Sequence, residues 1–332
     1  MDDLEFLKTH APSTERPGDA ATARAREALR ARIDAEEAPP AAEQRERRRH
    51  PWRWVGLAAA CVAAAAVAAS FLLAGSPARP DTAAASALHK AAEAARRQPS
   101  PAPLAAGEYV YVKSEGVQLM DVSQQAGVRF SVHVPFVREV WMGEHSLLRE
   151  TGGKAEFITP KDRETWVAAG KPHFYDGPQT SREPLNKYVP LDLSTNPSVL
   201  FARLKLEALG HGTGLYNEMF VLVGDDLRET ATSPAQRAAL YEVAARIPGV
   251  ELVGNVNDSA GRPGIAVAMT DATSHTHHVL TFDPTTSQLL AEEETVVEGN
   301  EFGWPSGTLI GSTTYLVHAV VGSDSEVPAA QK

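Results

Sequence analysis

Residues Trp54–Gly75 read WVGLAAACVAAAAVAASFLLAG, a run of 22 residues without Asp, Glu, Lys, Arg or His. At the α-helical rise, this run is long enough to cross a hydrocarbon layer of roughly 30 Å. A buried helix of a soluble domain is the alternative interpretation, but such a helix rarely reaches this length without a polar face. The pattern therefore predicts one transmembrane helix, over residues 52–75. A short tail precedes this helix, and a stretch long enough to form a folded domain follows it.

The residues that flank this segment predict its orientation. Only Arg79 follows closely, whereas five arginines precede the segment: Arg45, Arg47, Arg48, Arg49 and Arg53. Basic residues stay on the cytoplasmic side and Trp favours the interface, where Trp52 and Trp54 would lie. We therefore expect a protein of the plasma membrane that spans it once, with a cytoplasmic amino terminus and an extracytoplasmic carboxyl-terminal domain.

A cleavable signal peptide is the rival interpretation of the same run. About fifty residues precede the run, and the run itself exceeds the usual signal core of about 7–15 residues, so an uncleaved signal anchor is favoured. Cys61 is the only cysteine, and more apolar residues follow it than a lipoprotein cleavage site would leave. With one cysteine no intramolecular disulfide can form, so the outer domain must be held by its core.

The two sides of the membrane segment differ in charge. Residues 1–53 carry 11 basic and 11 acidic side chains, whereas residues 81–332 carry 20 basic and 31 acidic side chains, a net charge of −11. Nucleic acids and anionic lipids attract cationic surfaces. Charge therefore argues against either as a partner of the outer domain, and we predict no nucleic-acid partner.

Residues 1–50 are poor in bulky apolar side chains, so we expect a cytoplasmic tail that is largely disordered. Asp19 can cap one short helix over residues 20–37, which Pro39 and Pro40 would end. A second interpretation is a recognition segment that folds on a cytosolic partner through apolar residues at helical spacing. The candidate partner-binding residues are Leu4, Leu7, Leu29 and Ile33.

After a linker at residues 76–81, residues 82–322 show an ordered alternation of patterns. Helix signals cover 83–97, the stretch from Asn196 to Gly210, 216–228 and the stretch that follows Ser233, while 170–190 has the Gly and Pro content of a loop. Period-two strand patterns cover 108–114, 128–134, 137–142, 145–150, 155–158, 251–256, 265–270, 277–282, 289–297 and 309–320. This order predicts an α+β domain with an antiparallel sheet, followed by a disordered tail at 323–332.

Several short motifs of this domain carry a resemblance to a known family. They are Gly107-Glu-Tyr-Val-Tyr-Val112, Arg138-Glu-Val-Trp141, the Asn196-Pro197 helix start, Ala238-Ala-Leu-Tyr241, Ile247-Pro-Gly-Val250, Asp258-Ser-Ala-Gly-Arg-Pro-Gly264 and Phe282-Asp-Pro-Thr-Thr286. Through most of residues 82–320, the chain resembles actinobacterial single-pass membrane proteins often encoded beside extracytoplasmic-function sigma factors. At the level of fold it is similar to the LolA-like half-barrels of lipoprotein carriers and to periplasmic sensors that regulate sigma factors. The resemblance implies a curved antiparallel sheet packed by helices.

Candidate sites are few. Aromatic residues concentrate in the first strands, where core packing or contact with an apolar ligand can explain them; the candidate ligand-binding residues are Tyr109, Tyr111, Phe130, Trp141 and Trp166. His275 and His277 would share one face of a strand, where they could bind one metal ion, but no nearby Cys completes a metal site. A polar strand edge is therefore the favoured interpretation. No metal or cofactor is predicted.

No nucleophile motif is present, and the acidic pairs Asp225-Asp226 and Glu292–Glu294 fit solvated faces, so we predict a protein that is not an enzyme. The sequence favours a membrane-anchored envelope sensor or regulator. Its outer domain would bind an apolar or protein ligand and its tail a cytosolic sigma factor. The alternative is a surface-anchored carrier or binding protein for a lipid or lipoprotein, with an inert tail.

Overall fold

The structure is a computed structural model that describes residues 81–123, 128–175, 177, 180–184, 192–228, 232–298 and 303–328. All of them belong to one of two units into which the chain divides, the unit that spans Phe71–Lys332. The predicted cytoplasmic tail, the predicted transmembrane helix and all of the predicted linker except Asp81 lie outside the described residues. Among the helices that are described, none has the length and apolar character that crossing a membrane requires.

Local capping signals explain where most helices begin. Helix α3 (Thr82–Arg97) starts at Asp81, whose side chain accepts a hydrogen bond from the backbone N–H of Ala83. Helices α5 (Pro197–Ala208) and α7 (Pro234–Ala244) each begin with a proline after a capping side chain, as the sequence predicts. Helix α6 (Leu215–Leu227) follows the glycine-rich turn 210–214 without a side-chain cap.

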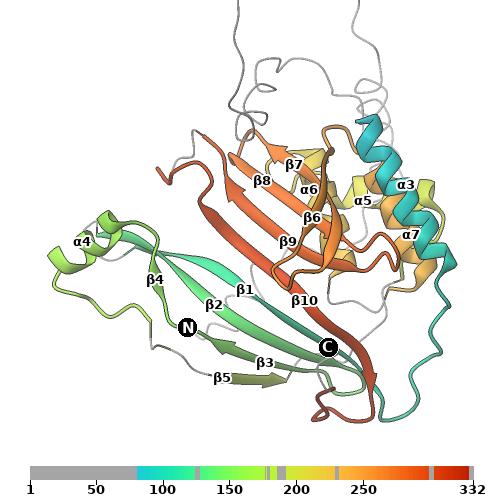
Figure 1. The fold of residues 1–332 in the computed structure, drawn as a ribbon, viewed down its shortest axis with the longest axis horizontal. Coiled ribbons are helices and arrows are strands. Elements are labelled where there is room, and N and C mark those ends of the chain that lie inside the picture. The colour runs from blue at the N-terminus through green and yellow to red at the C-terminus, as the bar shows by residue number, and fades with distance from the viewer. Residues whose placement is uncertain are drawn as a thin grey trace, which may run out of the picture. The chain divides into compact units, whose positions relative to one another are not determined.

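Ten strands form one antiparallel sheet in the part of the chain that the structure describes. The strands are β1 (Tyr109–Ser123), β2 (Arg129–Met142), β3 (Leu147–Gly152), β4 (Glu156–Phe157), β5 (Thr180–Pro184), β6 (Glu251–Asn257), β7 (Pro263–Asp271), β8 (Thr276–Phe282), β9 (Leu289–Val296) and β10 (Leu309–Val321). Their order is β5-β3-β2-β1-β10-β9-β8-β7-β6, with β4 paired to β2 (Figure 1). The first and last thirds of the domain therefore meet where β1 pairs with β10.

The main core lies between the sheet and four helices. Figure 1 shows α3, α5, α6 and α7 gathered beside the half of the sheet that contains β6 to β9. Val110 and Val112 of β1 point toward this core, whereas Tyr109 and Tyr111 pack in a separate cluster with Trp141. This confirms the predicted alternation along β1 and the predicted α+β class, with a large antiparallel sheet packed by helices.

Two elements correct the predicted boundaries. The predicted strands 128–134 and 137–142 are one strand, β2, which runs through Pro135. Proline is tolerated there because the neighbour of β2 changes at this point, from β4 beside Val132 and His133 to β3 beside Phe136. The stretch 170–190, predicted as a loop, contains strand β5, which adds to the edge strand β3.

Helix α4 (Pro160–Ala168) is a further element that the sequence prediction omitted. Thr159 and Asp162 form a capping box at its start, and Pro160 occupies the first helical position. At the other end of the domain, the described chain continues six residues past the predicted boundary at 322. The Glu326 carbonyl there accepts a hydrogen bond from the Trp141 indole N–H at 2.8 Å.

Candidate ligand-binding groove

A groove of about 650 Å³ lies between helix α6 and the sheet. Its floor comes from six neighbouring strands, from β3 on one side to β8 on the other. Apolar and charged side chains share the lining, which includes Val117, Phe136, Arg138, Glu150, Phe220, Asp225, Arg228, His278, Leu280, Glu292, Glu294 and Tyr315. A groove of this size, with a few polar groups among apolar ones, is the usual form of a binding site.

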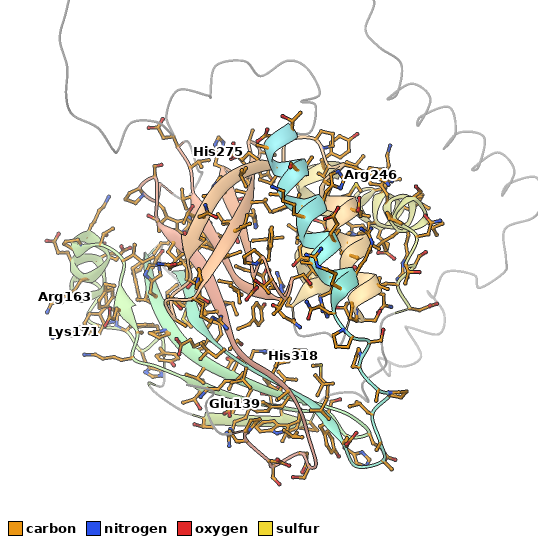
Figure 2. The ribbon with its side chains drawn as sticks, turned by 45° about the vertical axis from the view of Figure 1, so that its right-hand side comes forward. Glu139, Arg163, Lys171, Arg246, His275 and His318 are labelled. Atoms are coloured by element: carbon orange, nitrogen blue, oxygen red, sulfur yellow. The ribbon has the colours of Figure 1, made fainter. Side chains whose placement is uncertain are left out.

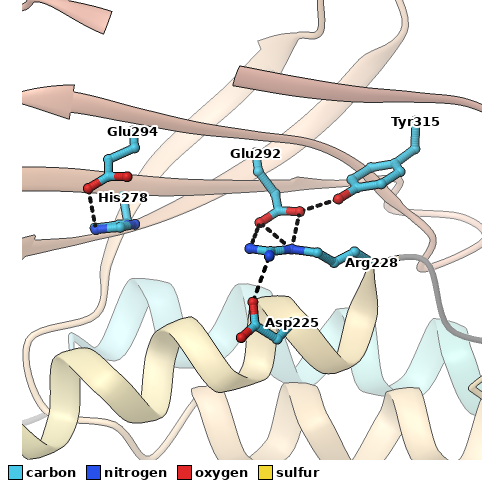
Figure 3. Close-up of polar contacts among 6 residues, drawn as sticks. All are labelled: Asp225, Arg228, His278, Glu292, Glu294 and Tyr315. Carbon is cyan, nitrogen blue, oxygen red and sulfur yellow. Dashed lines mark hydrogen bonds and ion pairs between the residues drawn. The ribbon is translucent and has the colours of Figure 1, made fainter. Parts of the chain in front are cut away.

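A four-residue ionic network crosses the groove from α6 to the sheet (Figure 3). Arg228 donates to both carboxylate oxygens of Glu292, from Nε at 2.9 Å and from Nη2 at 2.7 Å. The Arg228 guanidinium also contacts Asp225 at 2.7 Å, and the Tyr315 hydroxyl donates to Glu292. The Glu292 side chain is only 14% exposed, so its charge depends on these donors for compensation.

Local structure explains why these groups meet. Arg228 is the residue that caps the end of α6, and Asp225 lies one turn before it. Gly224 lets this end of the helix approach the sheet, since an added Cβ would already lie 3.3 Å from the Leu280 side chain. Glu292 and Tyr315 come from neighbouring strands, β9 and β10. The sequence interpretation of Glu292 as a solvated residue is therefore wrong, whereas Asp225, with 44% of its side chain exposed, does lie on a solvated face.

The network also sets the protonation of its members. Burial disfavours the charge on Arg228, but its hydrogen bond to Glu292 and the two nearby carboxylates more than compensate, so its pKa is raised. Burial raises the pKa of Asp225, and the Arg228 charge opposes that rise. For Asp226, burial and the charge of Glu207 raise the pKa to about 6. Arg228 is therefore held in its charged form, and burial makes the two α6 carboxyl groups easier to protonate.

Two further ion pairs line the groove. His278 Nε2 lies 3.0 Å from Glu294, and Arg138 lies 3.4 Å from Glu150. His277 is next to His278 along β8 and so points to the opposite face, where its Nδ1 lies 2.9 Å from the Thr270 hydroxyl.

His275 precedes β8 in a turn with φ of 57°, so the strand alternation that would align it with His277 does not apply. Within the described residues, no group of three His, Cys, Asp or Glu side chains is placed to hold a metal ion.

The five aromatic residues predicted to contact a ligand form two separate groups. Tyr111 and Trp141 lie with their ring centroids 5.1 Å apart, and Tyr109 packs with them. Phe130 and Trp166 belong to a second group, in which both pack against Phe157. Trp141 and Phe130 are eleven residues apart on β2, whose register with β1 is unbroken, so the two groups occupy opposite faces of the sheet.

Polar contacts accompany the first aromatic group. The Tyr111 hydroxyl donates to Glu139 at 2.7 Å, and Arg149 donates to the second Glu139 oxygen at 2.7 Å while lying over the Trp141 ring. Burial, then the hydrogen bond to Glu139, raises the pKa of Tyr111. Glu139 is only 7% exposed, so this cluster fixes β1, β2 and β3 together (Figure 2 labels Glu139).

None of the five predicted aromatic residues lies among the groove-lining residues. Tyr109, Tyr111, Phe130 and Trp141 are buried, which fits the core-packing alternative, and Trp166 is half-buried. Contact with a ligand stays a prediction for these five. The predicted partner-binding residues of the tail, Leu4, Leu7, Leu29 and Ile33, lie outside the described residues.

Comparisons with protein-family models and with curated proteins identify no match to this chain. The groove joins apolar walls, such as Phe136 and Phe220, to carboxylates and to the guanidinium groups of Arg138 on β2 and Arg228 at the end of α6. Such a lining suits an amphipathic ligand, because one wall takes apolar groups while the network takes polar ones.

Proposed function

We propose that this protein is a membrane-anchored envelope sensor or regulator, not an enzyme, whose outer domain binds a ligand in the groove under α6. The observation that carries this proposal is the groove itself, which lies in a domain that begins only six residues after the apolar segment Trp54–Gly75. A binding domain beside a membrane anchor has the parts that a sensor needs. The cytoplasmic tail would then report to a cytosolic sigma factor.

In this proposal, the ten-stranded antiparallel sheet is curved into a half-barrel. The groove is lined from β3 and from β8, which are five strand spacings apart. In a flat sheet these strands would lie about 24 Å apart, at about 4.8 Å per strand. One groove that reaches both is what a curved sheet produces, with α6 lying in its concave side. The resemblance to carrier half-barrels supports the same shape.

The ligand that this groove fits best is amphipathic, such as a segment of an envelope protein. The Phe136 and Phe220 side chains offer apolar contact, while Glu292 and Asp225 offer acceptors to a donor that competes with Arg228. Binding that displaces Arg228 from Glu292 would release the end of α6 from the sheet. Ligand binding would then change the position of α6, and this movement would serve as the signal.

A surface-anchored lipid or lipoprotein carrier is the second candidate function, and the apolar part of the groove lining favours it. The cytoplasmic tail distinguishes the two. A regulator needs residues 1–50 and a carrier does not. The signalling step rests on two apolar pairs at helical spacing, Leu4 with Leu7 and Leu29 with Ile33.

Titration calorimetry of residues 1–50 against extracytoplasmic-function sigma factors tests the regulator. Replacing Leu29 and Ile33 by Ala should weaken binding, because truncating one buried anchor costs about 1–4 kcal/mol. Replacing the neighbouring charged residues Arg30 and Asp34 by Ala is the matched control, because this variant should have a helix content similar to that of the Leu29 and Ile33 variant. If the wild-type segment does not bind, or all three segments bind equally, the sigma-factor proposal fails and the carrier replaces it.

The orientation has its own test. A reporter that works only outside the membrane should be active when fused after Lys332, and a cytoplasmic reporter should be active when fused before Met1. Exchanging the five arginines before the segment for Gln should weaken this preference. Activity of the outer reporter at the amino terminus would contradict the proposed topology.

A further inference from the structure

The outward face of helix α5 carries a stripe of apolar side chains without a partner among the described residues. Val199 is 56% exposed, Leu206 is 54% exposed and Leu209, just after the helix, is 40% exposed. Ala202 is exposed between them. Their spacing of three, four and three residues places all four on one side of a helix.

This stripe is not the core face of α5. Leu200, Leu204 and Ala208 are buried in the main core, and at 100° per residue they point in the opposite direction from the stripe. Arg203 and Lys205 lie on the two sides of the stripe. The helix is thus apolar on two opposite faces, and the core explains only one of them.

The stripe begins at the end of the helical layer where the chain arrives from the membrane segment. The backbone N–H of Leu252 donates to Asp81, which caps α3. Arg246, labelled in Figure 2, donates from the end of α7 to Ser198 in the first turn of α5. The start of α3 and the start of α5 are therefore both connected to the short stretch 246–252.

The distance to the bilayer is limited by the linker. Residues 76–81 are the only residues between the predicted membrane helix and α3, and six extended residues span at most about 20 Å. A surface held this close to a bilayer meets it at high effective concentration, so a small apolar contact is enough. The net charge of −11 provides no attraction, which leaves the apolar stripe as the contact.

A second copy of the chain is the competing occupant, and two observations disfavour it. Four side chains on a helix of 12 residues offer far less than the roughly 800 Å² per partner of a stable interface. In an antiparallel pair centred on the stripe, the Lys205 side chains of the two copies would also face each other. On a bilayer surface, Lys205 meets no second Lys205, and Arg203 keeps its ion pair with Glu207 at 2.8 Å.

We propose that the Val199–Ala202–Leu206–Leu209 stripe of α5 docks on the outer surface of the bilayer in which the chain is anchored. This inference rests on the membrane anchor of the proposed function. Docking fixes the orientation of the domain relative to the membrane. It also couples α5, which packs against α6, to the lipid surface on one side and to the groove on the other.

The test uses the full chain with Cys61→Ser, reconstituted in liposomes of phosphatidylcholine with and without phosphatidylglycerol. One variant adds Leu206→Cys and a second adds Val199→Cys, each labelled with an environment-sensitive fluorophore. The matched control is Val320→Cys, because Val320 is also 54% exposed but lies on the sheet, in β10 opposite Val110 of β1, and not on α5. Quenchers carried by lipid or dissolved in water then report where each label lies.

We expect lipid-borne quencher to reduce the fluorescence at positions 206 and 199 several-fold more than at position 320, in both liposome types. Equal protection at 206 and 320 overturns the inference. Shielding at 206 that grows with the protein-to-lipid ratio also overturns it, because a second copy then covers the stripe. If alkaline carbonate extracts the chain from the liposomes, both the anchor and the docking are overturned. If the chain stays in the liposomes but the label at position 206 is quenched from the water, only the docking is overturned.

Discussion

Removing the charge of Glu292 should loosen helix α6 from the sheet. In Glu292→Gln, the Arg228 guanidinium loses a carboxylate that it contacts through two nitrogens, at 2.9 and 2.7 Å. Breaking a fully buried pair costs about 3–5 kcal/mol, and an exposed pair contributes about 0.2–1 kcal/mol. Glu292 is 14% exposed and Arg228 is 42% exposed, so the cost lies between these limits, at about 2 kcal/mol.

Urea unfolding of residues 81–328, followed by circular dichroism, measures this cost. In thermal unfolding of the same domain, a loss of about 2 kcal/mol corresponds to a drop in Tm of roughly 4–8 °C. The matched control is Glu293→Gln on the same strand, because Glu293 is exposed and a surface change of this kind is worth less than about 0.5 kcal/mol. If the two variants lose the same stability, Arg228 and Glu292 do not act as a structural link and the reasoning is refuted.

Two more changes test the packing and the electrostatics of the domain. In Gly116→Ala, the new Cβ would come within 1.9 Å of the Ser312 carbonyl oxygen, so we expect a loss of about 2 kcal/mol or more. In Gly311→Ala, the nearest atom is 3.8 Å away, and its loss should stay much smaller in the same urea titration. Asp226, whose pKa is raised to about 6, holds its proton more tightly in the folded state than in the unfolded state, so its contribution to stability falls as pH rises from about 4 to 6. Asp226→Asn should remove that fall, and the same pH dependence in both proteins would contradict the raised pKa.

The sequence alone located most elements because their signals are local. Asp81, Asn196 and Ser233 each cap a helix through contacts within three residues, and the alternation of Tyr109 to Val112 shows in the chain itself. Such patterns depend only on backbone geometry and on which side chains avoid water. They predicted the α+β class and the antiparallel sheet. The loop signal at 170–190 failed because β5 forms by pairing with β3, which no local pattern specifies.

The groove was decided by tertiary structure. Arg228 and Glu292 are 64 residues apart, and neither residue's neighbours indicate that the end of α6 reaches β9. The pairing of β1 with β10 likewise joins residues about two hundred positions apart, and it brings both halves of the sheet to one groove. A carboxylate in a run such as Glu292–Glu294 looks solvated in sequence, because the sequence does not reveal which guanidinium approaches it. Local capping and alternation can be read residue by residue, but partners of buried charges are fixed only when the whole chain has packed.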